Sequence, residues 1–308
     1  MLEKGDADFA YVPPQFISQV KTMDNVVVED PEPAGVIRVL FYQWPIQGTR
    51  FTGSGKLDGN GIPPDFFADV KVRKAFNYLM PYDQLIEQIL DGYAFRIQGP
   101  MSSTFPAHSD DNPMYHYNRE KAIELLKEAH GGKLWEEGFK FTGVHNAGNY
   151  LAKSAMEMLA SELRNVNPKF KMNIHASTWN EFIPLRTAEK IPFFYSGWGG
   201  EPAAFLTLSE YLGSDGYFNP YIPGLAKLCE EKADPVFAEA IKTFDLKERT
   251  ELMKEVIEFS YDYATHMYLA EEAVRMVHRD EVEGWYFSQV VPGINMPGID
   301  FYALSKSE

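Results

Sequence analysis

The chain is nearly free of cysteine. Among its 308 residues Cys229 stands alone, so no disulfide can form within the chain, and zinc sites built from several cysteines are excluded. Basic residues are also scarce, because 29 Lys and Arg stand against 44 Asp and Glu, a net charge of −15. Nucleic acids and anionic membrane surfaces are bound through clustered positive charge, so the sequence argues against both as partners.

Long hydrophobic runs and catalytic motifs are missing as well. No stretch approaches the roughly 20 apolar residues that a membrane-spanning helix needs. The patterns H-E-x-x-H and G-x-S-x-G are absent, no Cys–His pairing is visible, and the seven histidines show no metal-ligand spacing. The sequence therefore predicts a protein that is not an enzyme and that uses neither a cofactor nor a metal.

The Gly- and Pro-rich segment 44–66 contains two weak motif matches. Its GSGK stretch resembles a phosphate loop, but Arg50 replaces the required first glycine and Leu57 replaces the Ser or Thr. The DGNG stretch at 58–61 resembles a calcium loop, yet no bidentate Glu follows at the required position. We interpret the segment as a cluster of turns.

Three amphipathic helices are predicted between residues 69 and 131. Asp69 can cap the first, and Pro81 ends it because proline lacks the backbone N–H that a helix interior uses. The second begins at Asp83, the third is capped by Asn118, and glycines close both, at Gly92 and at Gly131–Gly132. Apolar residues recur at spacings of three and four, which alone indicates only helices packed on a core.

The residues of this stretch also resemble one family in their order. An acidic residue precedes V-R-x-A-x-N-Y at 72–78, G-x-A and G-P follow at 92–94 and 99–100, and Y-N-x-x-K-A-x-x-L-L-x-E-A begins at Tyr117. This order resembles the extracellular solute-binding proteins of ABC importers, in the group that includes oligopeptide- and dipeptide-binding proteins. The resemblance implies an α/β fold of the type II periplasmic binding protein kind, in which two lobes close on a solute.

The remaining pattern is a mixed α/β order. Residues 26–30 and 36–43 read as strands separated by a Pro-rich turn at 31–35, and the second resembles the hinge strand of the family. Further elements are predicted as a helix at 149–165, a strand at 170–176, a helix at 180–189, a strand at 191–198, helices at 225–233, 235–244 and 247–264, and strands in the tail. Helices and strands in this order predict a layered α/β structure.

The resemblance also implies how the chain is divided. Residues 5–10 resemble a family phrase that lies well inside the full-length proteins, and the first ten residues resemble neither a signal peptide nor a lipoprotein leader. We therefore expect a C-terminal portion, with residues 1–43 and 268–308 from the first lobe and 44–267 forming the second. Such a portion lacks one wall of the solute site, so we expect it to bind solute weakly or not at all alone.

The strongest candidate for a ligand contact is Trp198, because flanking glycines can leave its flat ring uncovered for stacking. In the family the equivalent Trp opens a loop that lines the cleft, and an Asp three residues later holds the α-ammonium of a peptide. Here Glu201 takes that position, but it also matches an acidic-Pro-x-x-Phe phrase that lies further along in peptide binders. On the second alignment the anchoring Asp is deleted. The same stretch adds Tyr195 and Gly199 as candidates.

Three further candidates for the cleft are Trp44, Trp179 and Asn219. The resemblance implies a monomer, periplasmic or extracellular and associated with the membrane, that delivers a peptide-like solute to ABC permease subunits. Alternatives remain open: an oligosaccharide binder that uses aromatic faces, a sensor that signals to a membrane receptor, or a peptide or glycan hydrolase that uses Glu201 with a second carboxylate.

Overall fold

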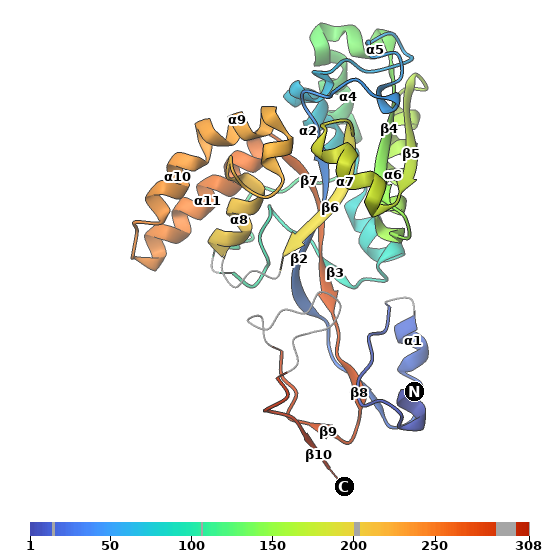
Figure 1. Ribbon diagram of the computed structural model, residues 1–308, viewed down its shortest axis with the longest axis vertical. Coiled ribbons are helices and arrows are strands. Elements are labelled where there is room, and N and C mark those ends of the chain that lie inside the picture. Colours follow the sequence, from blue (N-terminus) through green and yellow to red (C-terminus); the bar gives the residue numbers. More distant parts are fainter. Residues whose placement is uncertain (14–15, 106, 200–203, 288–299, 308) are drawn as a thin grey trace.

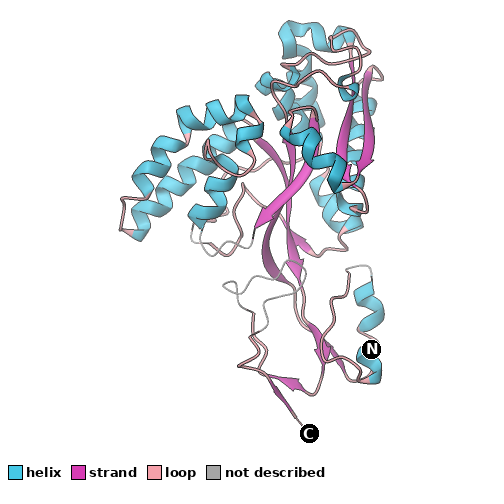
Figure 2. Ribbon diagram, viewed as in Figure 1, coloured by secondary structure: helices cyan, strands magenta, loops and turns pink. Residues whose placement is uncertain are grey.

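A computed structural model describes residues 1–13, 16–105, 107–199, 204–287 and 300–307. A larger upper part is built on a six-stranded sheet, and a smaller lower part contains both ends of the chain (Figure 1). Two long strands, β2 (Glu32–Tyr42) and β7 (His266–Val274), run from the upper sheet toward the lower part. Helices lie on either side of these strands (Figure 2). The predicted α/β class is confirmed.

The six-stranded sheet is mixed. Its order is β3-β7-β2-β6-β4-β5, with β2 antiparallel to both β6 and β7 and with β4 parallel to β5. Besides β2 and β7 it contains β3 (Ala94–Phe95), β4 (Phe139–Asn146), β5 (Phe170–Ser177) and β6 (Phe193–Gly199). Strands from the beginning and the end of the chain, β2 and β7, thus lie side by side in its middle.

Helices of the upper part begin where the sequence places side-chain caps. Asp69, Asn118 and Asn149 each accept a hydrogen bond from a backbone N–H in the first turn of the helix that follows. Such a cap contributes about 1 kcal/mol. The helices are α2 (Val70–Leu79), α4 (Arg119–Glu128) and α6 (Tyr150–Val166). These predicted helices are confirmed, although α4 ends before the predicted glycines, which belong to a 3-10 turn at Ala129–Gly132.

Two polar residues of the family phrase are buried in α2. Arg73 is 3% exposed, and its guanidinium donates to the carbonyls of Phe67, Ala68, Tyr263 and Ala264. Asn77 is 1% exposed and donates to the Tyr42 hydroxyl and to the carbonyl of Arg73. Buried polar groups need such partners, so the phrase fixes how α2 sits against the sheet and the end of the last helix.

A separate helical block covers the other side of the strands (Figure 1). Asp245 caps its longest helix by accepting from the Glu248 N–H. The last three helices confirm the prediction, while the first was not predicted. The block consists of α8 (Ala204–Leu212), α9 (Pro223–Lys232), α10 (Asp234–Ala240) and α11 (Leu246–Asp262).

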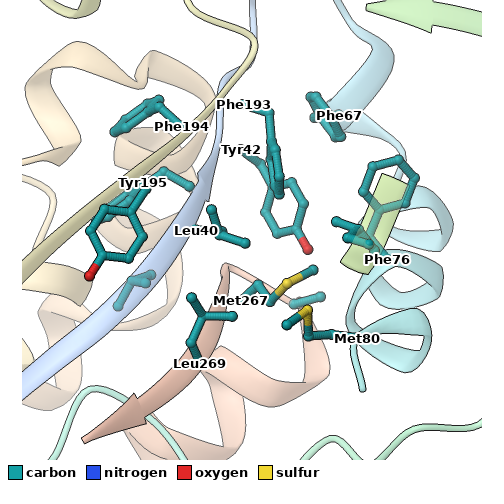
Figure 3. Close-up of a cluster of buried hydrophobic side chains, with 14 of the residues drawn as sticks. Leu40, Tyr42, Phe67, Phe76, Met80, Phe193, Phe194, Tyr195, Met267 and Leu269 are labelled. Atoms are coloured by element: carbon teal, nitrogen blue, oxygen red, sulfur yellow. The ribbon is translucent and has the colours of Figure 1, made fainter. Parts of the chain in front are cut away.

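Aromatic rings fill the core between the sheet and α2 (Figure 3). The ring centroid of Phe67 lies 5.2 Å from that of Tyr42 and 5.7 Å from that of Phe76, and Phe193 lies 5.4 Å from Tyr42. All four side chains are fully buried. Tilted and edge-on ring pairs at these distances add stability beyond the burial of area.

Three predictions of local structure were wrong or incomplete. Of the turn predicted at 31–35, residues 32–35 lie in β2, and the register of β2 with β7 shifts between Pro33 and Ile37. The helix predicted from Asp83 is one helical turn followed by a π-helical segment, Leu85–Ile89. Strand β4 and helix α5 (Lys133–Glu137) were not predicted.

Several short elements complete the fold. They are 3-10 turns at Leu2–Lys4, Arg50–Thr52, Phe66–Ala68 and Asn219–Tyr221, and the helices α1 (Ile17–Val20), α3 (Tyr82–Gln84) and α7 (Trp179–Thr187). The lower part adds the strands β1 (Val26–Val28), β8 (Val277–Arg279), β9 (Val282–Glu283) and β10 (Ser305–Lys306). Among the described residues, no helix has the length and apolar content needed to cross a bilayer.

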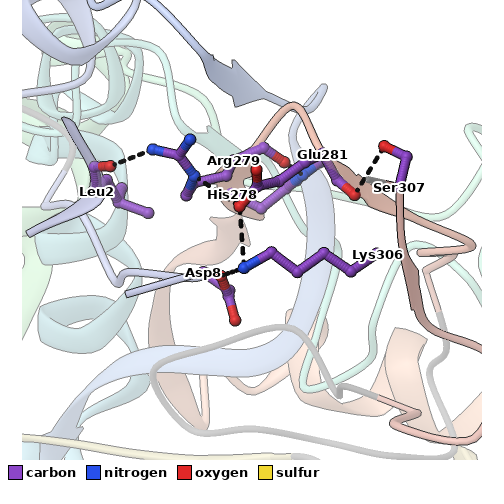
Figure 4. A network of polar contacts seen from close by, with 7 residues as sticks. All are labelled: Leu2, Asp8, His278, Arg279, Glu281, Lys306 and Ser307. Atoms are coloured by element: carbon purple, nitrogen blue, oxygen red, sulfur yellow. Dashed lines mark hydrogen bonds and ion pairs between the residues drawn. The ribbon is translucent and has the colours of Figure 1, made fainter. Parts of the chain in front are cut away.

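A polar network ties the two ends of the chain together in the lower part (Figure 4). The Lys306 ammonium lies 3.0 Å from an Asp8 carboxylate oxygen and 2.9 Å from a Glu281 oxygen. Arg279 contacts the same Glu281 carboxylate at 2.9 Å and donates to the Leu2 carbonyl. The lower part therefore depends on residues from both ends of the sequence.

Candidate ligand site

The end of β6 has one edge that no other described strand pairs with. From Phe193 to Gly199, β6 pairs with β2 along its whole length. On its other side, within the described part of the chain, β4 pairs with it only at Phe194. The last residues of β6 are half-buried. Backbone donors and acceptors at such an edge are available to an extended ligand.

Glycines let β2 and β6 approach closely at this end. A Cβ on Gly199 would lie 2.0 Å from the Gly35 carbonyl oxygen, and one on Gly197 would lie 2.7 Å from the Ile37 oxygen. Any side chain at these positions would push the strands apart. The predicted site residue Gly199 is thus required by the strand pairing, whatever it contributes to a ligand.

Trp198 is half-buried at the end of β6, and its ring stacks on that of Tyr217. The ring centroids are 4.6 Å apart and the planes make an angle of 27°. Its backbone N–H donates to the Tyr211 hydroxyl at 2.7 Å, and that hydroxyl also lies 3.2 Å from the Ile37 carbonyl oxygen. A tyrosine from α8 is thereby inserted between β2 and β6. Tyr217, 45% exposed, was not predicted as a site residue.

Tyr195 is buried beside a charged pair. It is 3% exposed, and burial raises its pKa to about 12, while the nearby Arg38 guanidinium partly offsets that effect. Arg38 binds the Glu272 carboxylate through two hydrogen bonds of 2.7 and 2.8 Å. The two charges therefore neutralise each other where β2 and β7 leave the upper sheet. A phenol held neutral here can donate or accept a hydrogen bond but carries no charge.

The neighbouring Glu271 is fully buried and holds a loop against the sheet. One carboxylate oxygen accepts from the Gly35 N–H at 2.9 Å and from the Ser102 hydroxyl at 2.6 Å. The other accepts from the Ser103 N–H at 2.9 Å and from the Ser103 hydroxyl at 3.1 Å. Four donors satisfy this carboxylate, so it acts as a positioning group for the strands below the site.

Two predicted site residues lie in the packed interior. Trp44 is 7% exposed, with the Arg73 guanidinium 4.4 Å above its ring. Gly224 touches that ring so closely that a Cβ there would lie 2.0 Å from it. Asn219 is fully buried and donates to the carbonyls of Tyr211 and Gly213. Their contact with a ligand stays a prediction, and the site proposed below is built without them.

Trp179 and Glu201 complete the predicted set. Trp179 is the first residue of α7 and is 53% exposed, with its ring edge-on to Phe182. Glu201 lies outside the described residues. The structure therefore brings Tyr195, Trp198 and Gly199 together at the end of one strand and leaves Trp179 exposed on a neighbouring helix. Among the described residues, no group of three His, Cys, Asp or Glu side chains could hold a metal ion.

Comparison with known proteins identifies the family. The model of the bacterial extracellular solute-binding proteins, family 5, matches residues 1–219. The chain belongs to this family. Its members are binding components rather than enzymes, and they are periplasmic or extracellular. The resemblance seen in residues 69–131 is confirmed.

Relatives agree in sequence and in fold. The dipeptide-binding protein of Escherichia coli is 26% identical over 221 residues, which cover 70% of this chain and 40% of the relative. Heme-binding protein A of Haemophilus influenzae is 28% identical over 61% of this chain and 34% of its own length. This family 5 chain thus matches less than half of the length of these curated relatives.

Solved structures confirm the type II binding-protein fold. The oligopeptide-binding protein AppA from Bacillus subtilis, in complex with a nonapeptide, matches with a TM-score of 0.72 at 16% identity. That match covers 100% of this chain and 57% of AppA. HbpA2 from Haemophilus parasuis matches with a TM-score of 0.76 at 16% identity, covering 100% of this chain and 55% of HbpA2. At these identities the likeness concerns the fold alone.

Proposed function

We propose that this family 5 chain is part of the substrate-binding component of an ABC importer and captures a peptide-like solute without covalent chemistry. The observation that supports it most directly is the edge of β6 beyond Phe194, which pairs with no further strand residue among those that the structure describes. An extended peptide can add to such an edge through its backbone N–H and C=O groups, as in other cases of β-strand addition. The stacked rings of Trp198 and Tyr217 stand at the same end of the strand.

The names of relatives support a peptide over a sugar. One relative is a dipeptide-binding protein, several are glutathione-binding proteins, and AppA holds a nonapeptide. A strand edge recognises the repeating amide groups of a peptide, whereas an oligosaccharide would depend on aromatic faces. Tyr217 covers one face of Trp198, which favours the peptide.

Closure of two lobes would enclose the solute. The two long strands β2 and β7 are suited to act as the hinge, because they connect the upper and lower parts (Figure 1). We place residues 44–267 in the second lobe and residues 1–43 and 268–308 in the first, so that one boundary follows the end of β2 and the other lies within β7. Closure of two lobes about a hinge is a known motion of periplasmic binding proteins. We further propose that the protein is a monomer, that it is associated with the membrane, and that it delivers the solute to the permease subunits.

An N-methyl scan of a bound peptide tests this mode of binding. Thermal-shift measurements over di- to hexapeptides and oligosaccharides first select the solute, because a ligand that binds only the folded state raises the melting temperature. Each amide N–H of that peptide is then replaced by N-methyl, one at a time. Strand addition predicts losses of about fivefold or more at alternate positions, since a strand exposes its hydrogen-bonding groups with a period of two.

A scan in which every position weakens binding alike would contradict the strand-edge proposal. Stabilisation by oligosaccharides with no response to any peptide would overturn the choice of solute. Turnover of a labelled peptide would instead favour a hydrolase.

A further inference from the structure

Arg186 is a buried cation with three aromatic rings close to its charge. It lies near the end of α7 and is 5% exposed. Its guanidinium carbon lies 5.3 Å from the ring centroid of Tyr217, 5.6 Å from that of Phe218 and 5.2 Å from that of Tyr221. Its Nε atom is buried and has no hydrogen-bond partner in the described part of the chain. Ring faces therefore help to hold this charge inside the protein.

Arg73, which is buried as deeply, is held in a different way. Its guanidinium donates to backbone carbonyls of Phe67 and Tyr263, which is the usual means of keeping such a group inside a fold. Arg186 instead contacts rings of the segment that leads from α8 to α9. A cation over an aromatic face is attracted more strongly out of water than in it, so this contact ties α7 to that segment.

Tyr217 connects this charge to the candidate ligand site. Its backbone N–H donates to a Glu210 carboxylate oxygen at 2.9 Å, which fixes the point from which the side chain extends. The ring is 45% exposed and stacks on Trp198 with the centroids 4.6 Å apart. A ring that is this exposed keeps one orientation only where its neighbours compensate the lost rotamer freedom. Arg186 and Trp198 are two such neighbours.

We propose that Arg186 is a positioning residue for the solute site: its guanidinium holds the Tyr217 ring, and that ring holds Trp198 in place at the end of β6. This inference rests on the proposed capture of a solute at that strand end, although the link from Arg186 to Trp198 can be measured without a solute. Arg186 acts through the stacked rings and does not touch the solute. When its charge is removed, the Tyr217 ring leaves the stack for part of the time and uncovers one face of Trp198.

The indole N–H signals of the five tryptophans, recorded by nitrogen–proton correlation NMR on the full chain, report this link. The Trp198 signal is the one that Trp198→Phe removes, and Tyr217→Leu shows where that signal lies when the stacked ring is lost. Arg186→Met removes the charge and keeps an unbranched side chain, so it should move the Trp198 signal in the same direction as Tyr217→Leu. Arg186→Lys restores a charge and should bring the signal back toward the parent position.

Affinity for trialanine, or for the peptide selected by thermal shift where trialanine does not bind, is the functional readout. Arg186→Met should weaken binding about fivefold, the size expected for loss of a desolvated cation–π contact, and Arg186→Lys should recover part of it. In a Tyr217→Leu chain, adding Arg186→Met should change neither the affinity nor the Trp198 signal further. Lys127→Met is the matched control, because its ammonium lies 5.2 Å from the Trp135 ring centroid: the Trp135 signal should move while Trp198 and the affinity stay unchanged.

The outcomes separate this inference from the proposed function. A Trp198 signal that stays at the parent position in Arg186→Met would overturn the inference, and so would a further shift when the change is added to Tyr217→Leu. Unchanged peptide affinity in Arg186→Met would overturn it too, even with the Trp198 signal displaced. If no peptide binds the parent, peptide capture is overturned, while a displaced Trp198 signal still supports the link. Arg186→Gln, which also lacks the charge, replaces Arg186→Met if that variant does not fold.

Discussion

Glu271 offers the sharpest test of how the strands below the site are held. Its two carboxylate oxygens receive four hydrogen bonds, two of them from backbone N–H groups of Gly35 and Ser103. Glu271→Gln replaces one oxygen by an NH₂ group, which is a donor. The hydroxyl facing it can rotate away, but the backbone N–H cannot, so one buried donor loses its acceptor.

The expected loss of stability follows from these contacts. An orphaned buried N–H costs about 1–3 kcal/mol, and the remaining bonds weaken by about 1 kcal/mol when the acceptor loses its charge. Together the change is about 3 kcal/mol. At about 2–4 °C per kcal/mol, as in larger domains, that corresponds to a fall in melting temperature of roughly 6–12 °C.

Urea unfolding followed by circular dichroism measures this loss. Glu251→Gln is the control, because Glu251 forms an exposed pair with Lys254 on α11 that is worth little. A Glu271→Gln chain that unfolds at the same urea concentration as Glu251→Gln would refute the reasoning, since the carboxylate would then add nothing beyond its shape.

Three further outcomes are expected. Burial lowers the pKa of His266 to about 3, so the folded state loses stability as pH falls from about 6.5 toward 3, by about 1.4 kcal/mol per pH unit. His266→Gln should therefore make the urea midpoint depend less on pH over that range. Gly224→Ala puts a methyl into the indole ring it touches and should lower the urea midpoint by an amount equivalent to about 1–3 kcal/mol, whereas Gly48→Ala, with open space around it, should be neutral. Trp198→Ala should weaken peptide binding about tenfold, measured by ligand-observed NMR, which detects the weak binding expected of this chain. Trp135→Phe, whose ring packs on the far strand β5, should leave the affinity unchanged, and equal affinities in both variants would remove Trp198 from the site.

Local signals explain what the sequence could predict. Asp69, Asn118 and Asn149 cap helices through contacts two or three residues away, so their position in the sequence was enough. The turn predicted at 31–35 was wrong because β7, more than 200 residues later, holds Pro33 and Gly35 in a strand. Pairing between distant segments overrode the local preference for a turn.

The site was only partly predictable for the same reason. Tyr195, Trp198 and Gly199 are close in sequence and lie on one strand, so predicting one of them as a site residue also placed the other two near the site. Tyr217 stacks on Trp198 only because α8 returns the chain to the strand, and no local pattern shows that. Arg38 did leave a signal, since it is the single charged residue in the apolar run 36–42, and such a residue in a buried strand calls for a partner.

The network that joins the chain ends also constrains when the lower part can fold. The Lys306–Asp8 contact spans 298 residues, and β1 must wait for β8 to be made before it can pair. During synthesis, residues up to Val28 therefore leave the ribosome long before β8, their strand partner, has been made. In contrast, β4, β5 and α6 pack on one another and are close in sequence. We expect the lower part to form last, because contacts between distant residues carry the largest loop-closure cost.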